Sequence, residues 1–146
     1  MSGFYVEFQI ESEAGFAKLA ALYAALQEAK ANDDWKNDEY WLKFIDEGAR
    51  KHFWWPTEAE SEEWRKRWFS TPIEKRFSDP SLQTKWEFAS MIEAFRNGDY
   101  ELLACRRSSQ ERARIEFDPY GHPYGGTGCM RGLVEAFGQR VIEVRE

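Results

Sequence analysis

The sequence predicts a single α+β domain over residues 1–146, with four to five helices packed on one face of a small four-stranded mixed or antiparallel sheet. Apolar and polar residues alternate near both ends of the chain, and this period of two is typical of half-buried strands. Apolar residues with a helical period fill the middle of the chain. The length of 146 residues suits one hydrophobic core, so we expect the element order β-α-α-α-α-β-β-α-β.

The first elements predicted are a strand and two helices. Residues 4–10 alternate apolar and polar side chains, which predicts a strand with one buried face. Ser12 is a favourable N-cap, and the apolar stripe after it predicts a helix that ends near Asn32. Asn37 opens a second helix, which we expect to run to the cations that precede Phe53.

Two further helices are predicted before the chain returns to strands. Thr57 and Glu60 form a capping box, and the acids of this third helix precede its bases, as the helix dipole favours. Asp79 and a proline at the next position start a fourth long helix, whose buried side includes Trp86. A glycine after Asn97 ends this helix as a left-handed cap.

The C-terminal third predicts a hairpin, a helix and a last strand. Residues 100–106 and 112–117 form the hairpin, a helix covers residues 127–137, and residues 140–145 form the final strand. We expect these three strands to lie close together, with the N-terminal strand joining them at a position that the sequence does not specify.

Composition limits the classes of partner. The net charge of −6 argues against binding to nucleic acid, whose phosphates attract a basic surface. The acids of residues 58–63, together with Asp33, Asp34, Asp38 and Glu39, could instead mimic a nucleic acid, but the basic residues interleaved in these helices argue against that. No apolar stretch approaches the ~20 residues of a membrane span. The N-terminus lacks a secretory signal and two cysteines do not make a disulfide framework, so we expect a cytoplasmic protein that binds no membrane.

Aromatic residues make up 16% of the chain and favour an interaction function. Trp54 and Trp55 are adjacent, so their side chains point in different directions and one of them can lie at an interface. Arg112 and Arg114 share one side of a strand, where they meet acids of a neighbouring strand or an acidic partner. The alternative reading is that the rings pack between helices.

The predicted function is therefore that of a non-enzymatic binding protein, whose partner is another protein or a second copy. Its small size, acidity and aromatic content are similar to those of bacterial immunity and adaptor proteins, a resemblance of composition. No cofactor is expected, and no pair of cysteines or histidines has metal-ligand spacing.

A glycine-rich loop, residues 118–128, offers a second function. It joins a strand to a helix, where bare backbone amides can hold a small anionic ligand. The candidate ligand-binding residues are Tyr120, His122, Tyr124, Gly125, Gly126, Thr127 and Gly128. Cys129 follows at the helix start, where the helix dipole lowers a thiol pKa, so Cys129 and His122 are weak candidates for nucleophilic chemistry. The other reading is a tight connection that glycine permits.

Overall fold

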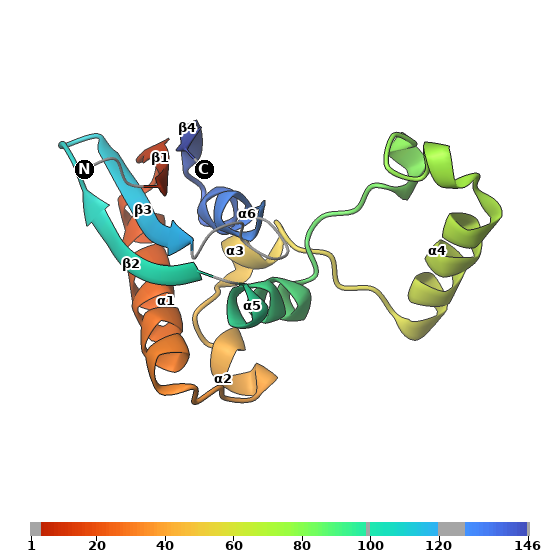
Figure 1. The fold of residues 1–146 in the computed structure, drawn as a ribbon, viewed down its shortest axis with the longest axis horizontal. Helices are drawn as coiled ribbons and strands as arrows, with labels where there is room; N and C mark the ends of the chain where they lie inside the picture. The colour runs from red at the N-terminus through yellow and green to blue at the C-terminus, as the bar shows by residue number, and fades with distance from the viewer. Residues whose placement is uncertain (1–3, 99, 120–127, 146) are drawn as a thin grey trace.

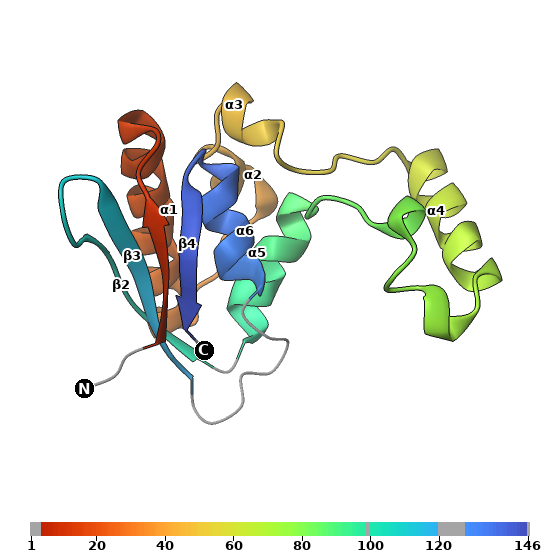
Figure 2. The same ribbon diagram turned by 90° about the horizontal axis from the view of Figure 1, so that it is seen from above.

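The computed structural model describes residues 4–98, 100–119 and 128–145, and it confirms the α+β fold class and the predicted order of elements. Four strands form one antiparallel sheet in the order β2-β3-β1-β4. Helices cover one face of this sheet (Figures 1 and 2). The strands are β1 (Phe4–Gln9), β2 (Tyr100–Arg107), β3 (Arg112–Pro119) and β4 (Arg140–Arg145).

The N-terminal strand lies inside the sheet, which corrects the expectation that the three C-terminal strands lie together. β1 pairs with β3 on one side and with β4 on the other, so Val6 lies opposite both Ile115 and Val144. Because β1 is antiparallel to both neighbours, β3 and β4 run in the same direction. Parallel strands need a crossover connection, and helix α6 (Gly128–Ala136) supplies it.

The inner face of the sheet and the helices that cover it form the core. Helix α1 (Glu13–Asn32) buries its apolar stripe, including Leu19, Leu22 and Leu26, and lies over β2. Helix α6 lies over β1 and β4. Strand residues facing the helices are buried, among them Phe8 and Ile115. Helix α5 (Phe88–Asn97) packs beside α6 and contributes three further buried side chains.

The second predicted helix is two short helices, α2 (Asp38–Leu42) and α3 (Glu47–Arg50). The side chain of Asp46 accepts a hydrogen bond from the backbone N–H of Ala49 at 2.9 Å. This N-cap restarts the helix after a break, because a cap residue holds a non-helical backbone.

The fourth predicted helix also starts later than the sequence indicates. A single 3₁₀ turn, η2 (Pro80–Leu82), follows the Asp79 cap, and α5 begins only at Phe88. Leu82 and Phe88 are both buried, but in different clusters. The chain between them is extended, because it must return from one cluster to the other.

Residues 57–83 form an arm that projects from the rest of the molecule, which we call the body (Figures 1 and 2). The arm contains α4 (Glu58–Ser70), η1 (Ile73–Lys75) and η2. Two extended segments connect it to the body, and the backbone N–H of Trp54 on one donates to the carbonyl oxygen of Trp86 on the other at 2.8 Å. The two connecting segments therefore meet where they join the body.

Candidate functional site

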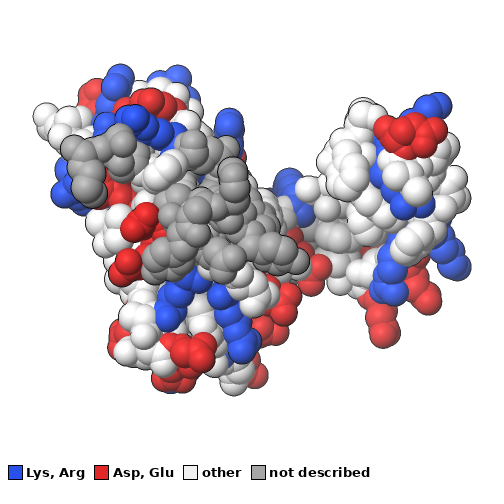
Figure 3. Space-filling view, in the orientation of Figure 1, with Lys and Arg blue, Asp and Glu red and all other residues white. Residues whose placement is uncertain are grey.

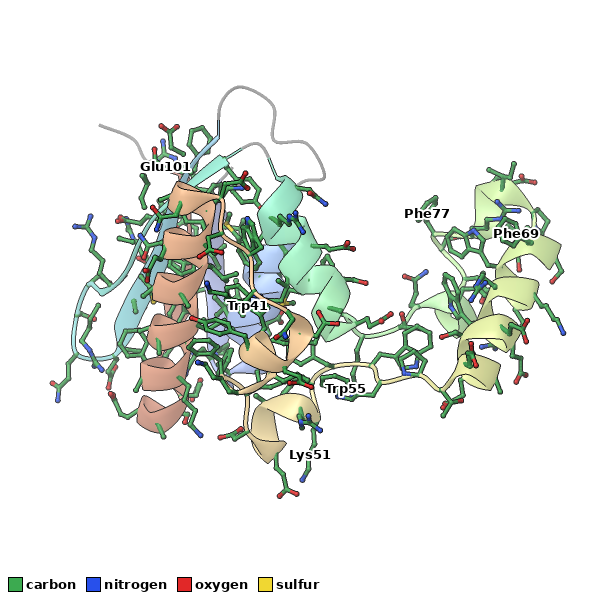
Figure 4. All side chains as sticks on the ribbon, turned by 90° about the horizontal axis from the view of Figure 1, so that it is seen from below. Trp41, Lys51, Trp55, Phe69, Phe77 and Glu101 are labelled. Atoms are coloured by element: carbon green, nitrogen blue, oxygen red, sulfur yellow. The ribbon has the colours of Figure 1, made fainter. Side chains whose placement is uncertain are left out.

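The arm is held together by a small aromatic cluster of its own. The rings of Trp64 and Trp68 stack with centroids 5.2 Å apart, as their spacing of four predicts. Phe77 meets Trp68 edge-on at 5.3 Å. The indole N–H of Trp64 donates to the carbonyl oxygen of Leu82 at 2.9 Å, which ties α4 to η2. Figure 4 shows Phe77 and Phe69 on the arm, far from Trp41 in the body.

This cluster is too small to be a core. Leu82 is the only buried residue of the arm, all of which the structure describes, and α4 buries none of its residues. Below about 40 residues, a chain rarely buries enough apolar surface to fold without a staple or a partner. The arm is therefore a segment whose order depends on its surroundings.

Three large apolar side chains of the arm face solvent, and we call them the distal patch: Phe69, Ile73 and Phe77. Their exposed fractions are 69%, 71% and 82%, the highest among the exposed large hydrophobic residues of the described chain. Phe69 lies near the end of α4, Ile73 begins η1 and Phe77 follows η1. Soluble monomers expose isolated apolar residues, whereas three so exposed on one short segment are typical of an interface. The distal patch is thus the candidate functional site.

Basic residues are close to the distal patch in sequence. Residues 65–77 contain five Lys or Arg and one Glu. The guanidinium group of Arg76 lies 5.6 Å from the ring centre of Trp68 and 5.5 Å from that of Phe69. None of these five bases forms an ion pair with any residue that the structure describes. Figure 3 shows the arm as a separate lobe with much uncharged surface.

The two tryptophans named from the sequence lie at the base of the arm. Trp54 is partly buried and its ring centre lies 6.3 Å from that of Trp64. Trp55 is 44% exposed; its indole N–H donates to the carbonyl oxygen of Arg50 at 2.9 Å, and its ring lies beside Phe88. Both residues join the arm to the body, and neither is buried in the core.

The two arginines named from the sequence lie on the open face of the sheet, away from the arm. Arg114 pairs with Glu7 across β1 and β3 at 2.8 Å, and its guanidinium group lies 4.0 Å from the ring centre of Tyr5. Arg112 reaches the same carboxylate at 3.9 Å. These contacts are cross-strand ion pairs on a solvated face. Pairing with acids of a neighbouring strand was the simpler of the two interpretations of the sequence.

Most of the glycine-rich loop lies outside the described residues, including Tyr120, His122, Tyr124, Gly125, Gly126 and Thr127. Gly128 begins α6, and a Cβ atom built there would lie 3.9 Å from the ring of Trp86. The predicted anion site is therefore not among the residues whose geometry is described.

Cys129 is a buried thiol, 2% exposed, rather than an activated one. Burial raises its pKa, whereas the helix start was expected to lower it. Its sulfur lies 3.2 Å from the hydroxyl oxygen of Tyr100, which donates to the carbonyl oxygen of Ala94 at 3.0 Å. The cost of desolvating the ionised thiol outweighs the stabilisation that a helix N-terminus gives it, because the side chain of Cys129 points into the core.

Comparisons with known proteins assign no function to this chain. No family model, no curated protein and no solved structure matches this chain. Within the described residues, no helix is long and apolar enough to cross a membrane. The same residues contain no group of three His, Cys, Asp or Glu placed to hold a metal ion.

The distal patch was missed by sequence reasoning, although a signal for it exists. Phe69, Ile73 and Phe77 recur every four residues, which favours a buried helical stripe. Pro72 stands within this run and ends the helix, so the stripe has no continuous helix to bury it.

Proposed function

We propose that this chain is a non-enzymatic interaction protein that binds another polypeptide through its arm. The observation that supports this most directly is the distal patch: three large apolar side chains, all more than two-thirds exposed, on a segment with one buried residue. A partner that covers the patch would supply the apolar burial that the arm lacks. Folding of the arm would then be coupled to binding.

The composition of the arm fits such a contact. Tryptophan, other aromatic residues and arginine are the residue types that most often dominate binding energy, and Trp68, Phe77 and Arg76 stand together here. Burial of each exposed ring would contribute about 2 kcal/mol. Within the described part of the body no large apolar side chain is more than half exposed, and Trp55 at the arm base is already held by Arg50 and Phe88.

Site-specific photocrosslinking in cells tests the proposal. A benzophenone amino acid replaces Ile73 in the distal patch, and in a matched control it replaces Ile142, which is 41% exposed on strand β4. We expect crosslinked species of higher mass from position 73 and none from position 142. Equal yields from both positions, or none from position 73, would show that the arm is not the binding surface.

A further inference from the structure

We infer that the occupant of the distal patch is a second copy of this chain, and that the two copies exchange arms. In this arrangement the basic, apolar end of each arm docks on the surface between α2 and α5 of the other copy, where three carboxylates line a pocket. This inference rests on the proposed function, because it names the partner that the arm binds. Four observations support it.

The first observation is a division of charge within the chain. Of its 26 acidic and 20 basic residues, the arm holds six and five, so the body carries nearly all of the net negative charge. The part of the arm around the distal patch, residues 65–77, has five bases against one acid. A second copy therefore offers a surface of opposite sign, and complementary charge selects partners and guides their encounter.

The second observation is a pocket of about 310 Å³ on the body, the α2–α5 pocket. Its lining combines apolar side chains, such as Trp35 and Ile92, with the carboxylates of Asp38, Glu87 and Glu93. None of these three acids forms an ion pair within the described chain. The pocket also includes Lys36, which pairs with Asp34, and Arg96.

The pocket and the arm have matching chemistry. A volume of this order suits an aromatic or branched side chain with a charged group at its rim. The distal patch presents such side chains, with unpaired bases beside them. Docking would pair bases of one copy with acids of the other and would cover apolar surface on both.

The third observation is the position of the pocket beside the base of the arm. Glu87 lines the pocket and is next in sequence to Trp86, which ends the arm's return segment at its hydrogen bond with Trp54. The arm also leaves the body on the side where α5 lies (Figure 1). Two copies related by a twofold axis can therefore each place an arm on the other, which closes the assembly at a dimer.

The fourth observation concerns stability. One arm docked on one pocket would be a small contact, at the weak end of specific interfaces. In a closed dimer both reciprocal contacts form between the same two chains. Once the first contact has formed, the second is effectively intramolecular, so it raises the affinity of the dimer. The hydrogen-bonded base restricts the path of each arm, which lowers the entropy lost on docking.

Sedimentation velocity on the purified full chain tests the exchange. We expect a dimer at ~100 µM and dissociation on dilution. Ile73→Asp should weaken the dimer at least about tenfold, because it buries a charge in the contact. Ile142→Asp is the matched control and should leave the dimer unchanged. Retained cooperative urea unfolding in both variants shows that the body is intact.

A complementation experiment separates arm-to-body docking from arm-to-arm pairing. Glu93→Arg alters the pocket and should also give monomers. In a one-to-one mixture with Ile73→Asp, the Glu93→Arg chain supplies an intact arm and the Ile73→Asp chain supplies an intact pocket. One of the two contacts can then form, so we expect a heterodimer with weaker affinity than the wild-type dimer. If the dimer were held by two arms packed on each other, every pair that includes an Ile73→Asp chain would keep a damaged contact, and mixing would not restore binding. The absence of a heterodimer therefore overturns the proposed docking.

The outcome also distinguishes this inference from the proposed function. If the wild-type chain stays monomeric at ~100 µM, the occupant of the distal patch is not a second copy of the chain. If position 73 still crosslinks to a different protein in cells, the arm remains a binding surface with another partner. If the chain is monomeric and position 73 crosslinks to nothing, both proposals fail.

Discussion

At the scale of single residues, Gly15 marks the closest approach between α1 and the end of α6. A Cβ atom at Gly15 would lie 2.2 Å from the carbonyl oxygen of Phe137, which belongs to the backbone and cannot rotate away. We expect Gly15→Ala to destabilise the fold by about 2–3 kcal/mol.

Gly48 in α3 provides the matched control. A Cβ atom there would meet its nearest neighbour, an oxygen of Asp46, at 3.4 Å. Because alanine favours a helix over glycine, Gly48→Ala should be neutral or should stabilise by up to about 1 kcal/mol. Urea unfolding of both variants checks the difference, and equal free energies of unfolding would contradict it.

Buried hydroxyl and thiol groups should make the stability of the fold depend on pH in the alkaline range. Burial raises the pKa of Cys105 to about 11 and raises that of Tyr23 above its ordinary value. In the unfolded chain these groups ionise near pH 8.5 and 10. The folded state therefore keeps protons that the unfolded state loses, so this stability is present below about pH 8 and declines as pH rises.

Urea titrations from neutral pH to about pH 10.5 measure this decline. In Tyr23→Phe we expect a lower midpoint at neutral pH, because the hydroxyl that donates to the carbonyl oxygen of Glu116 at 2.7 Å is lost. The fall with pH should also be shallower in this variant. A wild-type midpoint that does not change with pH would contradict the assignment.

At the scale of elements, two helices with the same kind of N-cap lie in different environments. The Ser12 hydroxyl accepts from the N–H of Gly15 at 3.0 Å and caps α1, which packs on the sheet. Thr57 caps α4 in the arm, with Glu60 completing the capping box. Ser12→Ala should cost about 1 kcal/mol of global stability.

Thr57→Ala should leave the global unfolding midpoint unchanged, because α4 buries none of its residues and does not share the core. Its effect should appear as faster hydrogen exchange in residues 58–70 alone. Hydrogen exchange with mass spectrometry resolves the two variants. A global loss from Thr57→Ala that matches Ser12→Ala would show that the arm unfolds together with the body.

Several elements with local signals were predicted well from the sequence, although Gly98 ends α5 with an extended backbone (φ −70°) and not as the expected left-handed cap. The strand at residues 4–10, the Ser12 cap and the capping box at Thr57 each depend on neighbours in sequence, and the structure confirms all three. The position of β1 between β3 and β4 depends on pairings more than 100 residues apart, which no local pattern encodes.

The arm illustrates why the candidate site was predicted less well. Periodicity reports which residues are apolar, but it does not report whether anything covers them. The sequence therefore placed Trp86 inside a helix, whereas it lies in the extended return segment and packs against α6 at Gly132. The exposed distal patch follows from the projection of the arm, and this is a property of the tertiary structure.

At the scale of the whole molecule, the arm is an insertion whose removal leaves a continuous body. The segments that connect it to the body are joined by the hydrogen bond from Trp54 to Trp86, and the arm contributes only Leu82 to the set of buried residues. The core of sheet and helices includes no residue of the arm. We therefore expect the body to fold on its own.

Replacement of residues 57–83 by a short glycine-serine linker tests this separation. The flanking segments meet at Trp54 and Trp86, so a short linker can close the chain, and a shorter loop costs less entropy to close. We expect the shortened chain to unfold cooperatively with a free energy within about 1 kcal/mol of the full chain. Sedimentation velocity on this variant should show only monomers, because both docking arms are absent. A shortened chain that folds and still dimerises would place the interface on the body, whereas one that fails to fold would show that the arm stabilises the core.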